Sequence, residues 1–63
     1  MKEILNYLRE LELNLRALPT PDYKKYIDPK EIEYIHEQIQ LLLDYYDYPF
    51  DKLKKRFPIV CSL

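Results

Sequence analysis

The sequence predicts an all-α protein, in which an antiparallel two-helix hairpin is followed by a short third helix at the C-terminal side. Three observations support this class: two long segments have apolar residues at helical spacing, glycine is absent, and five prolines divide the chain. Without glycine, the positive-φ positions of tight β-hairpins are hard to fill. The 63 residues are expected to form a single domain, residues 1–63. A core this small gains stability from a second copy or another partner, and dimerisation would complete a four-helix or six-helix bundle.

The first helix is expected over residues 2–18. Its apolar residues follow one another at intervals of three and four, which places them on one stripe at about 100° per residue. The stripe consists of Ile4, Leu8, Leu11, Leu15 and Leu18. Pro19 ends the helix. Two further leucines, Leu5 and Leu13, lie off the stripe on the side of Arg9 and Arg16.

Residues 19–28 form a connector, and its last residue gives the best local signal in the chain. Asp28 is suited to the N-cap position and Pro29 to the first helical position. Glu31 stands three residues after Asp28, as in a capping box, and Ile27 with Ile32 would form a hydrophobic staple. The second helix is therefore expected to begin at Pro29.

This second helix is predicted to span residues 29–47 and to have more apolar surface than one neighbour can cover. Its main stripe contains Ile32, Ile35, Ile39, Leu42 and Tyr46. A second stripe, rotated by about a quarter turn, contains Tyr34, Gln38, Leu41 and Tyr45. The remaining arc is mostly acidic. The pattern predicts a central helix with neighbours on two sides and one face in water.

A short third helix is expected over residues 49–57, between two prolines. Pro49 suits its first turn, and Pro58 stops it. We expect Phe50, Leu53 and Phe57 to point inward. Its cations point outward: Lys52, Lys54, Lys55 and Arg56. The apolar tail, residues 58–63, is expected either to pack across the bundle or to fray.

Overall charge and segment pattern limit the function and the compartment. Ten basic and eleven acidic side chains give a net charge of −1, which argues against a strongly basic nucleic-acid binder and against an all-acidic DNA mimic. Neither a signal peptide nor a membrane-spanning segment is recognised, so we expect a cytoplasmic protein that does not enter a membrane. Cys61, the only cysteine, cannot form an intramolecular disulfide.

Metal and catalytic chemistry have little support. Glu33 and His36 match the Glu-x-x-His pair of di-iron bundles, but they point about 140° and 80° away from the centre of the main stripe, whereas core ligands face inward. His36 and Glu37 begin a zinc-protease motif whose second histidine is replaced by Gln40. The nucleophiles Cys61 and Ser62 lie near the chain end. We expect no enzyme, cofactor or bound metal; a metal-binding helical-bundle enzyme is a remote alternative.

The leading hypothesis is a small non-enzymatic protein-binding module that regulates or inhibits a larger intracellular protein. Tyrosine and arginine dominate binding hot spots, and several leucines lie outside the core stripes. The candidate binding residues are Leu5, Arg9, Leu13, Arg16, Tyr34, Leu41 and Tyr45. Such a size suits an accessory protein of a phage or mobile element. In the alternative view, the tyrosines only cover the ends of the bundle.

A second hypothesis, from a different class, is a weak nucleic-acid-binding accessory protein. Cations contact phosphates without reading the base sequence. The residues that would do so are Lys52, Lys54, Lys55 and Arg56, all in the short third helix. The acidic arc of the second helix would repel a duplex nearby. These cations could instead pair with carboxylates within the bundle.

Overall fold

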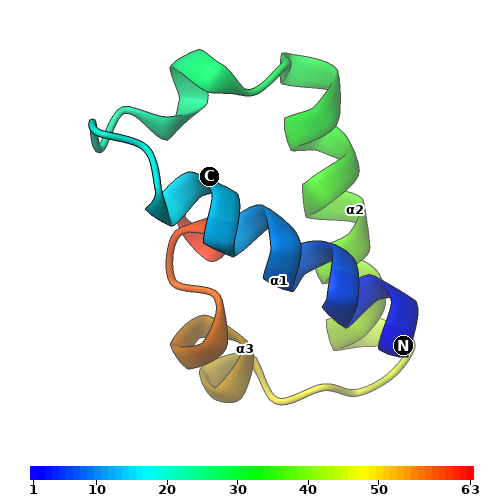
Figure 1. The fold of residues 1–63 in the computed structure, drawn as a ribbon. Coiled ribbons are helices and arrows are strands. Elements are labelled where there is room, and N and C mark those ends of the chain that lie inside the picture. The colour runs from blue at the N-terminus through cyan, green and yellow to red at the C-terminus, as the bar shows by residue number, and fades with distance from the viewer.

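The protein, described over all of residues 1–63 by a computed structural model, has helices as its only regular secondary structure (Figure 1). It contains three α-helices: α1 (Lys2–Arg16), α2 (Pro29–Asp44) and α3 (Phe50–Arg56). Two short 3₁₀ turns accompany them, η1 (Tyr23–Tyr26) in the connector and η2 (Val60–Ser62) in the tail. No strand is present. The all-α class predicted from the sequence is therefore confirmed.

The N-terminal helix, α1, ends at Arg16, two residues before the predicted end. The amide of Leu18 donates to the carbonyl of Leu15 over 3.1 Å, so the final turn tightens toward 3₁₀ geometry. Pro19 has no amide hydrogen and disfavours helical angles at the residue before it. Pro19 therefore causes the helix to end early, although the proline itself lies after the helix.

The second helix, α2, begins at Pro29 as the local sequence predicts. The carboxylate of Asp28 accepts a hydrogen bond from the amide of Lys30 over 2.8 Å, which satisfies one of the free donors of the first turn. Glu31 does not complete a capping box, because its Oε1 accepts a hydrogen bond from the hydroxyl of Tyr7, 3.3 Å away. The predicted cap is therefore made by Asp28 alone, and Glu31 connects α2 to α1.

At its C-terminal end α2 stops at Asp44, three residues earlier than predicted. Asp47 has φ = 53°, the left-handed conformation that is usually taken by glycine. This conformation turns the chain back, so that the amide of Tyr48 donates to the carbonyl of Leu42 over 2.8 Å. In a chain without glycine, an aspartate fills the position, as its short polar side chain allows.

Two residues expected inside the core lie outside it. Tyr46 does not extend the main stripe, since the helix has already ended and the side chain is exposed. Phe50, the first residue of α3, is exposed as well, although we predicted it to point inward. Helical periodicity does not continue past the end of α2, and the prediction for Tyr46 was wrong for this reason. The prediction for Phe50 was wrong within α3 itself, where Phe50 is exposed and Leu53 is buried.

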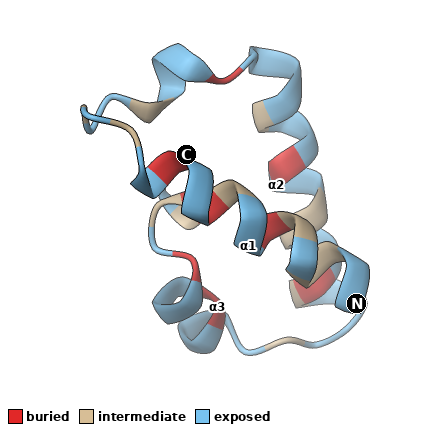
Figure 2. Cartoon of the chain, in the orientation of Figure 1, coloured by how far each residue is buried: buried red, intermediate tan, exposed pale blue.

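The core joins all three helices and the tail (Figure 2). Its buried apolar residues are Leu8, Leu15, Ile27, Ile35, Leu42, Leu53, Phe57 and Val60. Val60 is completely buried, so the tail packs against the bundle and does not fray. Ile27 is buried too, which anchors the end of the connector.

The two long helices meet through the N-terminal half of α1. Tyr7 contacts Tyr34 of α2, and beyond this point the C-terminal end of α1 diverges from the beginning of α2, with the connector bridging the two (Figure 1). The C-terminal half of α1 lies against η2. The antiparallel hairpin stays a prediction. No helix has the length and apolarity that crossing a membrane requires.

Candidate protein-interaction surface

The second apolar stripe of α2 contains three exposed apolar side chains. Tyr34 keeps 48%, Leu41 43% and Tyr45 77% of its surface accessible. Together with the half-buried Gln38 they occupy every third or fourth position, which aligns them along one face of the helix. We call these four residues the outer stripe. We expected neighbours on two sides of α2, and the protein's own third helix does not cover this side.

One edge of the outer stripe borders α1. The rings of Tyr7 and Tyr34 make an edge-to-face contact with centroids 5.5 Å apart. Partial burial, and next the negative charge of Glu31, raise the pKa of Tyr7 above its ordinary value of 10.0. Tyr7 thus contacts two residues of α2 at this edge, Tyr34 through its ring and Glu31 through its hydroxyl, which donates a hydrogen bond over 3.3 Å.

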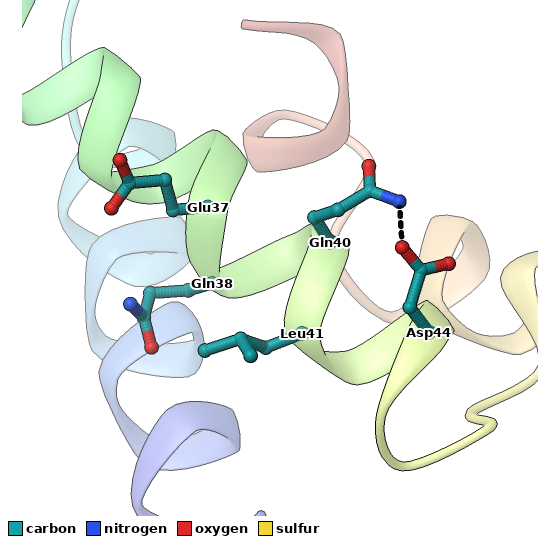
Figure 3. A pocket seen from close by; sticks show the side chains of 5 residues that line it. All are labelled: Glu37, Gln38, Gln40, Leu41 and Asp44. Carbon is teal, nitrogen blue, oxygen red and sulfur yellow. Dashed lines mark hydrogen bonds between the residues drawn. The ribbon is translucent and has the colours of Figure 1, made fainter.

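Two shallow hollows lie along the outer stripe, and both include Gln38. The larger, about 370 Å³, is formed by α2 alone. Figure 3 shows its lining side chains: Glu37, Gln38, Gln40, Leu41 and Asp44. The smaller, about 160 Å³, lies between α1 and α2 and is lined by Glu3, Ile4, Tyr7, Tyr34 and Gln38. The two hollows share Gln38, and we call them together the depression beside the stripe.

Carboxylates surround this depression. Glu3 lines the smaller hollow, between α1 and α2, and Glu37 and Asp44 line the larger one. None of them takes part in an ion pair, because the only two in the molecule are Arg16–Glu12 and Lys25–Asp22. Asp44 accepts a hydrogen bond from the amide group of Gln40 (Figure 3). The outer stripe is thus an apolar strip, and the carboxylates at its edges have no cation partner.

The candidate residues on α1 lie elsewhere. Leu13 is 56% exposed and Arg9 is exposed, but Leu5 is half-buried and packs against the core. Leu13 follows Tyr7 by six residues, which places it about a third of a turn away from the α2 side of α1 at 100° per residue. Arg16 binds the carboxylate of Glu12 over 3.3 Å. These four residues therefore do not extend the outer stripe.

On α3 all four predicted cations are exposed, and none forms an ion pair within the molecule. The alternative that they pair with carboxylates of the bundle is wrong. Instead, Lys52 lies over the ring of Tyr48, and Lys54 lies over the ring of Phe50, 5.9 Å from its centroid. Arg56 packs over Phe57, while Lys55 has no such aromatic neighbour.

Sequence reasoning missed the most unusual polar residue, Glu12, which is only 3% exposed. Its Oε1 accepts hydrogen bonds from the amides of Ile59 at 3.1 Å and Val60 at 2.9 Å. Its Oε2 binds Arg16. A buried carboxylate is tolerated when hydrogen bonds satisfy it, and here those bonds hold the tail against α1. The available signal was its position between Leu8 and Leu15, on the apolar side of the helix.

The residues considered for metal binding and catalysis are dispersed. No group of three or more histidine, cysteine, aspartate or glutamate side chains is placed to hold a metal ion. Nε2 of His36 lies 2.9 Å from the carbonyl oxygen of Leu63, which anchors the tail. Cys61 is half-buried, and its Sγ lies 3.8 Å from the carbonyl oxygen of Leu53. Burial, followed by the charge of Glu12, raises the pKa of its thiol above the ordinary 9.0, which lowers its reactivity.

Comparison with known proteins adds no relative. Neither a protein-family model, nor a curated protein, nor a solved structure matches the chain.

Proposed function

We propose that the protein is a small non-enzymatic protein-binding module that regulates or inhibits a larger intracellular protein by docking on it through the outer stripe. One observation carries the proposal: Tyr34, Leu41 and Tyr45 stay largely exposed after all three helices and the tail have packed. Tyrosine supplies a large contact area with an additional hydrogen-bonding group, and exposed apolar strips with a polar edge mark interaction sites.

A photo-crosslinking residue at position 45 tests this directly. It should capture a specific protein from cells of the source organism, while the same residue at the exposed Glu10 position serves as the matched control. The captured protein is then purified, and its affinity for the chain is measured. Leu41→Ser and Tyr45→Ser should each weaken binding by about tenfold or more if these side chains are hot spots.

The regulatory part of the proposal needs its own measurement. Adding the wild-type chain should change the activity of the captured protein, and Leu41→Ser should abolish the change at equal concentration. Binding that survives both stripe substitutions, in variants whose helical circular dichroism is intact, would refute the outer stripe as the docking site.

A second copy of the chain could also occupy the stripe, as the predicted dimer would require. Light scattering over a concentration series distinguishes this case. A mass that doubles with concentration for the wild type, and stays at the monomer value for Leu41→Ser, supports dimerisation through the stripe. A constant monomer mass excludes it and leaves the external partner.

The second candidate function is weak nucleic-acid binding by α3. It is supported by the exposure of all four cations, their lack of ion pairs and the exposed ring of Phe50 beside Lys54. Phosphate neutralisation makes such binding steeply dependent on salt. Replacing the four cations by glutamine should eliminate it. Affinity for single-stranded DNA that does not change with salt would refute this candidate.

A further inference from the structure

We propose that the partner presents an amphipathic helix whose apolar stripe is flanked by lysine or arginine, and that this helix lies along the outer stripe of α2. The inference rests on the proposed function and specifies the chemistry of the partner. It follows from three properties of the stripe: its helical spacing, the depression beside it, and the sign of the charges around it.

The spacing and the depression favour a helix. The exposed side chains at positions 34, 41 and 45 form a ridge, and the hollow between α1 and α2 lies beside its Tyr34 end. Helices pack by placing such ridges into grooves, and grooves of this kind bind partners with apolar anchors at helical spacing. The chain has no strand, so a peptide has no sheet edge to extend.

The charges favour a basic partner. Glu3, Glu37 and Asp44 line the two hollows, and Glu33 is exposed on the same side of α2 as Glu37. None of these four carboxylates has a cation within the molecule at ion-pair distance. The one neighbouring cation on α2 is Lys30, one helical turn before Tyr34. Cations at the edges of a docked helix would complement this surface, whereas carboxylates there would be repelled.

The protein's own basic helix fits less well than an external one. From Tyr34 to Tyr45 the stripe is about 16 Å long at 1.5 Å per residue, whereas the seven residues of α3 span about 10 Å. In addition, α3 exposes only one large apolar side chain, Phe50, and Lys54 lies over its ring. A second copy therefore offers the correct charge but too short an apolar contact.

The test uses two synthetic helical peptides of about 18 residues, long enough to span the stripe. Both have leucines at spacings of four, three and four. In one peptide lysines flank the leucines, and in its twin glutamates replace those lysines. Binding of each labelled peptide to the full chain is followed by fluorescence anisotropy. At about 0.1 M salt the lysine peptide should bind at least about tenfold more tightly, and the ratio should approach one near 1 M salt, where charges are screened beyond about 3 Å.

Variants of the chain locate the effect. Leu41→Ser should weaken binding of the lysine peptide by about tenfold, because it removes a central anchor. The pair Glu37→Gln and Asp44→Asn should weaken it by about two- to tenfold, as expected for exposed charges. Asp51→Asn is the matched control, since Asp51 is an exposed carboxylate on α3 that lines neither hollow. It should change the affinity less than twofold.

Each contrary result overturns the inference in a distinguishable way. If both peptides bind equally and Leu41→Ser weakens binding of both, the inferred basic character of the partner is refuted, while docking through the outer stripe is still supported. If the lysine peptide binds independently of Leu41, or neither peptide binds, the basic helix is rejected. If the cross-linked partner also ignores Leu41, the proposed function fails as well. If the chain dimerises through the α3 cations, the occupant is a second copy.

Discussion

Glu12 on α1 and Glu37 on α2 are the same residue type on neighbouring helices, but their surroundings are opposite. Glu12 is buried, and amide hydrogens of the tail and Arg16 satisfy its oxygens. Glu37 is exposed beside an apolar strip, and no cation pairs with it. The difference distinguishes what we call the closed side, around Glu12, where the chain itself satisfies the charge, from the open side, around Glu37 and the outer stripe, where the charge has no cation partner. The closed side contributes to stability, and the open side is the one that we propose for binding.

The largest expected effect tests the closed side. Glu12→Ala leaves the amides of Ile59 and Val60 without their acceptor and removes the partner of Arg16. Leaving the buried Val60 amide and the part-buried Ile59 amide unsatisfied costs about 2–4 kcal/mol in free energy of unfolding, whereas Arg16, whose side chain is largely exposed, adds little when it loses its partner. A domain of this size has little more than that in total. Urea denaturation measures the loss.

The matched control for this variant is Glu10→Ala, an exposed glutamate on the same helix, which should change stability by about 0.5 kcal/mol or less. Equal effects of the two substitutions would mean that Glu12 does not hold the tail.

The next effect concerns the turn between α2 and α3. Asp47→Val places a β-branched residue at φ = 53°, which should destabilise the protein by about 1–2 kcal/mol. Asp47→Gly fits this conformation and should leave stability unchanged or slightly increased. Thermal unfolding followed by circular dichroism compares the two variants. A glycine variant as unstable as the valine variant would contradict the left-handed turn.

A smaller effect is expected at alkaline pH. The pKa values of Tyr7 and Cys61 are raised in the folded protein, above ordinary values of 10.0 and 9.0. The stabilisation linked to their neutral forms is therefore fully present below about pH 9 and is lost as pH rises through the raised folded values. Urea midpoints measured between about pH 8 and 11 should fall.

A Tyr7→Phe, Cys61→Ala double variant isolates this contribution, because the remaining tyrosines and lysines titrate in both proteins. Its midpoint should fall less steeply with pH than that of the wild type. At neutral pH the variant also lacks the exposed hydrogen bond from Tyr7 to Glu31, which contributes about 0.5 kcal/mol. Parallel pH profiles would show that neither group is linked to folding.

The smallest expected effect on stability tests the open side. Tyr45→Ser removes a side chain that is 77% exposed and should change the free energy of unfolding by about 0.5 kcal/mol or less. The same substitution is expected to weaken partner binding strongly. If denaturation showed a large decrease in the free energy of unfolding, Tyr45 would belong to the folded core in solution. The open side would then no longer differ from the closed side.

The sequence predicted the helices best where the decisive signals are local. Asp28 and Pro29 placed the beginning of α2 correctly, because capping depends on neighbouring residues. The end of α2 was missed because the left-handed position, normally a glycine, is taken by Asp47. That error moved Tyr46 into the predicted core, although it is exposed. Phe50 was misplaced separately, at the first residue of α3.

The candidate site, too, could be predicted only as far as local spacing and residue type allowed. The spacing of Tyr34, Leu41 and Tyr45 gave their common face, and their chemical types suggested binding. The spacing could not predict that α1 would cover this face no further than the contact between Tyr7 and Tyr34. That extent depends on how the two helices cross. Glu12 was missed because its partners lie 47 and 48 positions later in the chain. In the sequence, the only sign of that contact is a charged residue between two core leucines.

The bond between Glu12 and the amide of Val60 spans 48 positions and joins the first helix to the final turn. Closing a loop this long costs conformational entropy that local contacts cannot repay, so the bond should form late in folding. Once formed, it ties the tail to the rest of the bundle, and the tail cannot detach without exposing Val60. The Val60 amide should therefore exchange its hydrogen with solvent only through global opening of the protein. Its exchange rate would report the stability of the entire molecule from a single position.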